Sequence, residues 1–330
     1  LEKSNFKMVS NLLSKALSMV RFYMLNDKIA SHSKELFLSL LKKNKIIPSK
    51  FHYDYKGSKY FEKITKTKEY YVTRIEKNIL KKIAKEINFI FGEDLTFVEF
   101  GSGSTEKISI LINNNVKYYI PLDISFNFIK KSSKKLQKLF SYLKIIPKYC
   151  DYTNYVNLSK NTTNTKIGFF LGSSIGNFYN NREKIFLKNA KKTLGKKNFM
   201  FVGVDLIKKA EILEKAYNDK KKFAEKFNLN LLNVVNKKLK IKIKLKDFKY
   251  IGTYNKKKKC MENFIISKKN QSFDIKNKKI YFKKNEKIQT EISNKFTISK
   301  FKSIIDATGW KLKKYWTDQK KYYAVFLLES

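Results

Sequence analysis

Two glycines and several acids stand at the ends of apolar runs, where a ligand could be held. In VEFGSGSTEK, residues 98–107, an apolar run ends in Gly101 and Gly103, which let the backbone turn tightly and approach a ligand closely. Asp123 ends the next apolar run, 22 residues after Gly101, and a carboxylate there can accept hydrogen bonds from both hydroxyls of a ribose. Asp151 follows a third run and can receive the exocyclic amino group of a base. Together these residues predict a site for an adenosine-containing ligand.

The glycine spacing distinguishes between the nucleotide ligands that such a turn could bind. The dinucleotide fingerprint needs a third glycine at position 106, which is Glu106 here, and this bulkier turn favours S-adenosylmethionine over a pyrophosphate. The sequence has no G-x-x-x-x-G-K-[ST] motif for a nucleoside triphosphate. A glycine pair alone would also fit a plain strand-to-helix turn, but the acids at successive strand ends favour a ligand site. We expect a helix from about Glu106, with its N-terminal amides pointing at the ligand.

The elements that position these residues alternate between strands and helices. Strand-length apolar runs, separated by segments long enough for helices, occur at 96–100, 117–123, 144–150, 167–172 and 199–205. This alternation predicts an α/β fold with a Rossmann-like parallel sheet. Helices are expected over 181–193 and over 296–310, the latter closed near Gly309. Residues 311–318 and 322–330 then predict a terminal hairpin that adds an antiparallel edge.

Two regions depart from this alternation and predict a second lobe. Residues 1–74 are polar and helical in pattern, and residues 208–297 pass from helical patterns into alternating strand patterns. We therefore expect a nucleotide-binding domain from 75–207 and 298–330, and a discontinuous α+β substrate lobe from 1–74 and 208–297. Thr73 with Glu76 predicts a capping box that starts a helix.

The net charge of +44 suggests a polyanionic partner, but its composition argues otherwise. The positive charge is almost all lysine, with Arg21, Arg74 and Arg182 as the arginines, whereas base readout prefers the arginine fork. We therefore expect no specific nucleic-acid partner. The rival hypothesis is a nucleic-acid-binding protein or an RNA methyltransferase. An adenine-N6 enzyme would carry an Asn/Asp-Pro-Pro-aromatic turn after the fourth strand, where this chain has LGSSIGNF, residues 171–178.

The remaining composition bears on compartment, metals and membranes. Cys150 and Cys260 lie far apart, with no CxxC pattern or neighbouring histidine, which predicts reduced thiols in a cytoplasmic setting and no metal site. No apolar run approaches the roughly 18 residues of a membrane span, so no membrane partner is expected. We expect a monomer that acts on a small molecule.

Several stretches together resemble one family, the S-adenosylmethionine-dependent histidine Nα-methyltransferases of ergothioneine biosynthesis. These stretches are FHYDYKGSKYFEKIT, EYYVTRIEKNIL, VEFGSGSTEKI, PLDIS, FLGSSIGNF, GVDLIKKAEILEKAYND, FNLNLLNVVN and YWTDQKKYYAVFLLE, in the family's order from residue 51 to the C-terminal end. The resemblance implies a class I methyltransferase sheet with a two-segment substrate lobe. It also implies three methyl transfers to the α-nitrogen of histidine.

The resemblance also implies roles for individual residues. Those that would contact S-adenosylmethionine are Gly101, Lys107, Asp123, Asp151, Tyr152 and the backbone of Gly172. For the amino acid, Asn177 and Tyr217 would hold the α-carboxylate, and Tyr53 would orient the α-nitrogen as the catalytic candidate. Phe61 would line the pocket, and the imidazole would be hydrogen-bonded by Glu291 and Ser293.

Two departures from the family pattern leave amino acids other than histidine as possible substrates. Asn263 stands where the family has a methionine beside the ring, and Ala224 replaces a threonine on the helix after Tyr217. Both positions touch the part of the site that selects the side chain, so another amino acid, such as tryptophan, is an alternative substrate. A catalytically inactive member that serves as a binding module is a third alternative.

Overall fold

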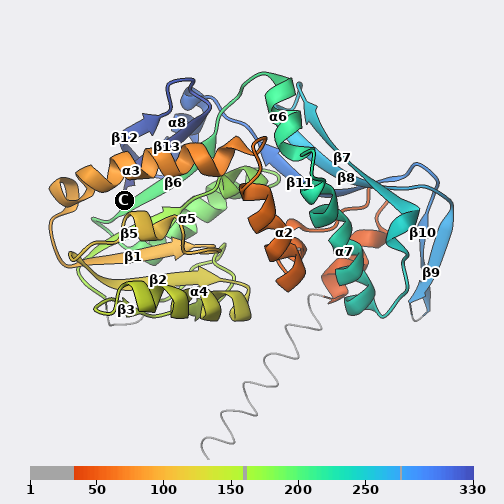
Figure 1. Cartoon of the computed structure of the whole chain (residues 1–330), viewed down its shortest axis with the longest axis horizontal. Helices are drawn as coiled ribbons and strands as arrows, with labels where there is room; N and C mark the ends of the chain where they lie inside the picture. The colour runs from red at the N-terminus through yellow and green to blue at the C-terminus, as the bar shows by residue number, and fades with distance from the viewer. Residues whose placement is uncertain (1–32, 159–161, 276) are drawn as a thin grey trace, which may run out of the picture.

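The central sheet has the strand order of one half of a Rossmann fold. The structure is a computed structural model that describes residues 33–158, 162–275 and 277–330. The strands follow the order β12-β13-β6-β5-β1-β2-β3 (Figure 1). Those from β6 to β3 pair in parallel, whereas the C-terminal hairpin is antiparallel. The order β3-β2-β1-β5-β6 is that of a nucleotide-binding half-sheet, so the predicted sheet and hairpin are confirmed. The bounds are β1 Leu95–Phe100, β2 Val116–Asp123, β3 Lys144–Ile145, β5 Thr165–Phe170, β6 Phe199–Asp205, β12 Lys311–Thr317 and β13 Tyr323–Glu329.

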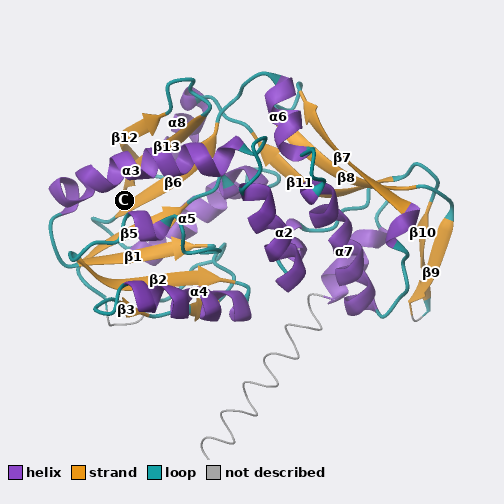
Figure 2. Ribbon diagram, viewed as in Figure 1, coloured by secondary structure: helices purple, strands orange, loops and turns teal. Residues whose placement is uncertain are grey.

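Helices cover both faces of this sheet, because alternate strand residues are apolar on each side (Figure 2). Phe97 packs in one core with residues of α3 (Tyr71–Phe91) and α4 (Phe126–Leu139). Its neighbour Val98 belongs to the other core, with residues of α5 (Arg182–Leu194) and α8 (Ile298–Asp306). The sheet is thus buried on both faces, and its strand ends are left as the place for a ligand.

The second lobe combines an N-terminal segment with a long insertion between β6 and α8. The insertion holds two helices and a three-stranded antiparallel sheet in the order β11-β8-β7, followed at the far end by the β9–β10 hairpin (Figure 1). An isolated bridge from Ile46 to Gln289 ties the N-terminal segment to β11. The bounds are η1 Ser49–His52, α2 Tyr55–Thr65, α6 Ala210–Tyr217, α7 Phe223–Leu239, η4 Leu245–Asp247, β7 Phe248–Asn255, β8 Cys260–Ser267, β9 Gln271–Ile275, β10 Lys278–Phe282 and β11 Lys287–Asn294. The exact division at 74/75, 207/208 and 297/298 stays a prediction.

Three local predictions are wrong. No α-helix follows the glycine turn, only the three-residue 3-10 helix η2 (Ile108–Ile110), because a turn at 113–115 soon leads into β2. Helix α3 begins at Tyr71, so Thr73 does not cap it, and the Glu76 side chain is buried within the fold. The strand predicted over 144–150 is split into β3 and β4 (Lys148–Tyr149), because Pro147 lacks an N–H for the ladder.

One close contact joins the two lobes beside the strand ends. The 3-10 helix η3 (Ser174–Asn177), which follows β5, packs against β11. A Cβ on Gly176 would lie only 2.7 Å from the carbonyl oxygen of Asn294, so this approach requires glycine. Among the described residues, no helix is long and apolar enough to cross a membrane.

Candidate active site

The three strand ends predicted to hold the nucleotide lie side by side. The Gly101 amide donates to the carbonyl oxygen of Leu122 at 2.8 Å, which places the glycine turn against the end of β2. The Gly103 amide donates to Asp123 Oδ2 at 3.3 Å. The Cys150 amide donates to the carbonyl oxygen of Asp123 at 3.0 Å, so the residues after β4 reach the same edge. These contacts make one continuous edge of the glycine turn, Asp123 and the segment from 150.

Tyr152 stands over the glycine turn and explains why that turn needs glycine. Gly101 has a φ of +70°, and a Cβ built on it would lie 2.9 Å from the Tyr152 hydroxyl oxygen. The Tyr152 ring is held by Phe170 and Phe186, with ring centroids 6.1 and 6.4 Å away. Asp151 beside it is exposed, and its Oδ1 accepts hydrogen bonds from the amide and hydroxyl of Thr153.

Asp123 carries a carboxylate whose charge is only partly compensated. Burial raises its pKa above the ordinary value, and hydrogen bonds from the amides of Ser125, Gly103 and Ile124 act in the opposite direction. Backbone amides occupy both oxygens, Ser125 on Oδ1 and Gly103 on Oδ2. These bonds fix the carboxylate in place, and each oxygen keeps acceptor capacity for a hydroxyl.

Glu76 links the glycine turn to the end of β5, and the sequence analysis missed this role. Its Oε1 accepts from the Gly172 amide at 2.7 Å and from the Tyr323 hydroxyl at 2.6 Å. Its Oε2 accepts from Lys107 Nζ at 3.0 Å, and the Glu76 side chain is fully buried. Lys107 and Gly172, both predicted to contact the cofactor, are therefore positioned by one buried acid.

All seven residues predicted to bind the amino acid line one pocket between the lobes. The pocket also includes Ala224 and Gly172, whose backbone is predicted to contact the cofactor. Its walls come from the segment at Tyr53, α2, the start of α3, η3, the end of β6, α6, α7 and the β11-β8-β7 sheet. The predicted residues that line it are Tyr53, Phe61, Asn177, Tyr217, Asn263, Glu291 and Ser293. The predicted site is thus brought together in space, although its members come from segments far apart in the chain.

An aromatic cluster forms one side of this pocket. The Tyr53 ring contacts Phe61 and Phe227 edge-on, at centroid distances of 5.9 and 6.0 Å. Phe61 in turn contacts Tyr70 at 6.3 Å. Burial raises the pKa of Tyr53 well above its ordinary value, with the negative charge of Glu291 adding to the effect. The Tyr53 hydroxyl therefore remains protonated and acts as a neutral hydrogen-bonding group.

Glu291 lies on the polar side of the pocket and is held by two amides. Asn177 Nδ2 donates to Oε1 at 3.0 Å, and Asn263 Nδ2 donates to Oε2 at 2.8 Å. Asn263 is itself oriented by the Tyr250 hydroxyl, 3.1 Å from its Oδ1. Burial raises the pKa of Glu291 to about 7, against the lowering effects of the Asn263 bond, the Lys295 charge and the Asn177 bond. The Asn263 departure thus supplies a polar partner to the acid of the pocket.

Comparison with known proteins places this architecture in a family. A family model described as "Histidine-specific methyltransferase, SAM-dependent" matches residues 32–330. The chain belongs to this family. A histidine N-alpha-methyltransferase of Mycobacterium tuberculosis is 27% identical over 293 residues, covering 87% of this chain and 91% of that protein. One from Mycolicibacterium smegmatis is 28% identical over 281 residues, covering 83% and 87%. An L-tryptophan methyltransferase from Psilocybe serbica is 24% identical over 321 residues, covering 87% and 89%.

The edge of the sheet fits the cofactor on which this histidine-specific methyltransferase family depends. The glycine turn under Tyr152 is a cradle that a Cβ would fill, and Asp123 offers acceptor capacity for ribose hydroxyls. Among the described residues there is no cluster of histidine, cysteine, aspartate and glutamate able to hold a metal ion.

Sequence reasoning missed several residues of this methyltransferase pocket. Tyr70, Phe227 and Tyr250 line it and carried no signal beyond being aromatic. Asp205 also lines it, and here a signal existed, because Asp205 ends β6 as Asp123 ends β2. An acid at the end of a predicted parallel strand is a reason to examine that position.

Proposed function

We propose that this chain transfers methyl groups from S-adenosylmethionine to the α-nitrogen of a free amino acid, L-histidine, ending in the trimethylated betaine. The observation that carries the proposal is one pocket that combines two acids, several hydroxyls and three side-chain amides with Gly172, which we assign to the cofactor. Such a pocket can receive a small zwitterion and leave its nitrogen facing the cofactor. The family match over residues 32–330 supports the same chemistry.

In this proposal Glu291 and Ser293 recognise the imidazole. A carboxylate can accept the ring N–H, and a hydroxyl can donate to the other ring nitrogen. The two amides that bind Glu291 fix the direction of its oxygens, which favours one ring orientation. Because the pKa of Glu291 is about 7, its carboxylate form predominates only above neutral pH.

Asn177 and Tyr217 are assigned to the α-carboxylate, and Tyr53 to the α-nitrogen. The Asn177 amide gives one hydrogen to Glu291 and keeps a second for the substrate. The nitrogen must be unprotonated to react, and Tyr53, as a neutral phenol, can accept an N–H and so orient the lone pair. Phe61 closes the aromatic side and excludes water.

S-adenosylmethionine supplies an electrophilic methyl group on a sulfonium, whose positive charge also lowers the pKa of a neighbouring ammonium. We assign its binding to the edge described above. Gly172 lines the amino-acid pocket, and its amide and Lys107 both donate to Glu76. The residues assigned to hold it are Gly101, Lys107, Asp123, Asp151, Tyr152 and Gly172.

Another amino acid, such as tryptophan, is the second candidate substrate. Asn263 and Ala224 alter the wall that selects the side chain, and a tryptophan methyltransferase is among the relatives. Against indole, the Glu291–Ser293 pair offers partners for two ring nitrogens, and indole has one. The nucleic-acid alternative depends on the +44 charge alone. A cytoplasmic, monomeric protein without a specific nucleic-acid partner remains our prediction.

The test is incubation with labelled S-adenosylmethionine and the twenty amino acids, followed by identification of the product by mass. We expect a histidine product heavier by three methyl groups. A tryptophan product without a histidine product would replace the first candidate by the second. Filter binding to RNA at moderate salt checks the nucleic-acid alternative, because sequence-selective retention would favour it and affinity lost with salt would reflect surface charge.

A further inference from the structure

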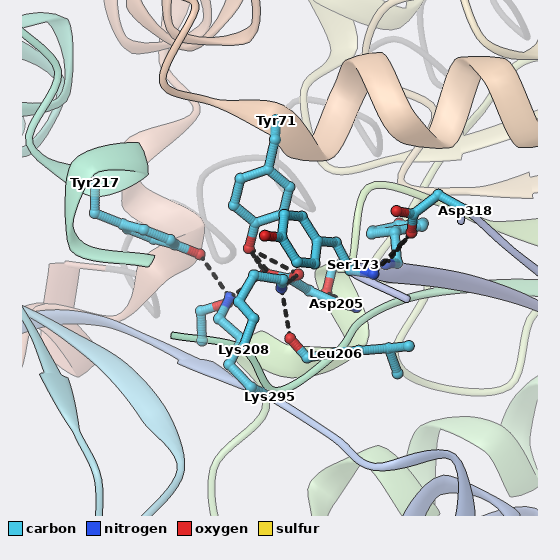
Figure 3. A network of polar contacts seen from close by, with 11 residues as sticks. Tyr71, Ser173, Asp205, Leu206, Lys208, Tyr217, Lys295 and Asp318 are labelled. Carbon is cyan, nitrogen blue, oxygen red and sulfur yellow. Dashed lines mark hydrogen bonds and ion pairs between the residues drawn. The ribbon is translucent and has the colours of Figure 1, made fainter. Parts of the chain in front are cut away.

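A buried cluster of charges lies directly behind the amino-acid pocket. Asp205, at the end of β6, pairs with Lys295 at 2.7 Å, and both side chains are fully buried. Lys208 pairs with the other carboxylate oxygen at 2.5 Å and also donates to the Tyr71 hydroxyl. Figure 3 shows Tyr217 reaching this cluster from one side and Tyr71 from the other. Burying two lysines with one aspartate is costly, and the ion pairs and the hydrogen bonds to Tyr71, Tyr217 and Ser293 offset that cost.

Lys295 uses all of its hydrogen-bond donors within this cluster. Its Nζ lies 2.7 Å from Asp205 Oδ2, 2.8 Å from Ser293 Oγ and 3.1 Å from the Tyr217 hydroxyl oxygen. An ammonium has three donors and no acceptor, so these contacts saturate it. Lys295 therefore has no donor left for a substrate, and its partners Ser293 and Tyr217 line the pocket in its place.

These contacts determine how the two hydroxyls behave. Because an ammonium can only donate, the oxygens of Ser293 and Tyr217 must both accept from Lys295, and their own protons point away from it. Burial, together with the charges of Glu291 and Asp205, raises the pKa of Tyr217 well above its ordinary value, against the lowering effect of a hydrogen bond with Ser293. Tyr217 thus keeps its proton, and a hydroxyl that accepts from a cation becomes a stronger donor to the next group.

The cluster also places positive charge next to the pocket, whose own lining contains no cationic side chain. The lining residues include the acids Asp205 and Glu291 but no lysine or arginine. Burial alone would raise the pKa of Asp205, but the charges and hydrogen bonds of Lys295 and Lys208 outweigh it, so the pKa lies below the ordinary value. Lys295 brings its positive charge to within 3.1 Å of the Tyr217 hydroxyl oxygen, whereas the hydrogen bonds of Lys208 go to Tyr71, Asp205 and the Leu206 carbonyl oxygen.

We propose that Lys295 is a positioning residue, which sets Ser293 and Tyr217 as donors and supplies the positive charge that the α-carboxylate of the substrate senses. This inference rests on the proposed function, because it assigns a partner to the carboxylate of the same amino acid. It explains how a pocket whose lining includes acids and neutral donors, but no cationic side chain, can select an anionic group. Lys208 shares Asp205 but touches neither Ser293 nor Tyr217, so Lys208 is the matched control.

The experiment compares L-histidine with L-histidinamide, which lacks the carboxylate charge, in the wild type, Lys295→Met and Lys208→Met. For Lys295→Met we expect KM for histidine to rise about tenfold or more, with little change for histidinamide, because a charge-assisted network is lost. Lys208→Met should keep the wild-type ratio of the two KM values. An equal change of this ratio in both lysine variants, or no change in Lys295→Met, would overturn the proposal.

A second variant keeps the test decisive if Lys295→Met fails to fold, as judged by thermal unfolding and S-adenosylmethionine binding. Tyr217→Phe removes the hydroxyl through which Lys295 acts and leaves Asp205 paired. We expect this variant to lose most of the preference for histidine over histidinamide, and unchanged preference would contradict the proposal. Where both variants fold, the effects of Lys295→Met and Tyr217→Phe should be non-additive.

The failure of the proposed function is recognised separately, in the wild type. If the wild type methylates a different amino acid, the same ratio is measured with that amino acid and its amide. If the wild type shows no turnover, calorimetric affinities for histidine and histidinamide give the ratio. The role of Lys295 is judged only by how this ratio differs between the two lysine variants.

Discussion

The nucleotide side and the amino-acid side of the site are built in different ways. The nucleotide side uses consecutive turns at the ends of neighbouring strands, with Gly101 and Asp123 held by backbone hydrogen bonds. The amino-acid side is assembled from the N-terminal segment, η3 and the insertion, with Glu291 held by side chains from two other elements. A change on the first side should therefore affect any substrate equally, whereas a change on the second should alter the choice of substrate.

The largest effect is expected at the glycine turn. Gly101→Ala would place a Cβ 2.9 Å from the Tyr152 hydroxyl, in addition to the strain of a positive φ. We expect S-adenosylmethionine binding to weaken and kcat/KM to fall roughly 100-fold or more for every amino acid. Calorimetric titration with the cofactor provides the measurement.

Gly92→Ala is the matched control for Gly101→Ala. Gly92 has nearly the same φ, +69°, but nothing lies within 4 Å of its added Cβ. This variant should gain only the strain of a Cβ at positive φ, lose about 1 kcal/mol of stability because of it, and bind the cofactor as the wild type does. If both variants bound S-adenosylmethionine equally well, the glycine turn would not be the cofactor site.

On the amino-acid side, Glu291→Gln should lower activity toward the amino acid and leave cofactor binding unchanged. The substitution removes the charge that accepts from Asn177, Asn263 and the ring, so kcat/KM for histidine should fall about 10- to 100-fold. Cofactor affinity should stay within about twofold of the wild type. Glu262→Gln on β8 is the control, since this carboxylate pairs with Lys258 and Asn255 outside the pocket. Equal losses of kcat/KM in the two variants would show that Glu291 does not recognise the ring.

The same acid predicts a pH dependence of stability. The folded-state pKa of Glu291 is raised to about 7, above its unfolded value, so the folded state holds the extra proton between these two pKa values. Stability should therefore fall as pH rises through that interval and level off above pH 7. We expect the wild type to lose on the order of 2 kcal/mol more than Glu291→Gln between pH 5 and pH 8. Urea unfolding at both pH values measures this, and parallel curves for the two proteins would contradict it.

The smallest effect is expected at Asn263, where this chain departs from the family pattern. Asn263→Ala removes one of the two amides on Glu291, so kcat/KM for histidine should fall about threefold to tenfold, mainly through KM. Asn255→Ala, which removes a similar amide from Glu262, should leave KM unchanged. In a double-mutant cycle, Asn263→Ala should add little to Glu291→Gln. Full additivity would show that Asn263 does not act through this acid.

The same contrast explains how much could be predicted from the sequence. The strands, the glycine turn and Asp123 follow from patterns within short windows, and the structure places them together. The helix expected after Gly103 was wrong, because hydrophobic residues at 108, 110 and 112 gave no warning that a turn would follow so soon. Lys295 is one of many lysines, and only the tertiary structure distinguishes it, by burying it against Asp205. The local pattern around Glu76 predicts only a helix cap, because its partners Gly172 and Tyr323 are distant in the chain.

The short turn after β5 has a consequence for how this enzyme can change. Gly172 at its start donates to Glu76, and Asn177 at its end donates to Glu291, while Gly176 packs against the backbone of Asn294. These six residues therefore span the distance between the proposed cofactor site and the proposed amino-acid site, so a shift at one end of the turn should move the other end. New substrate preferences should accordingly arise from replacements on β8 and β11, which can vary while that spacing is kept.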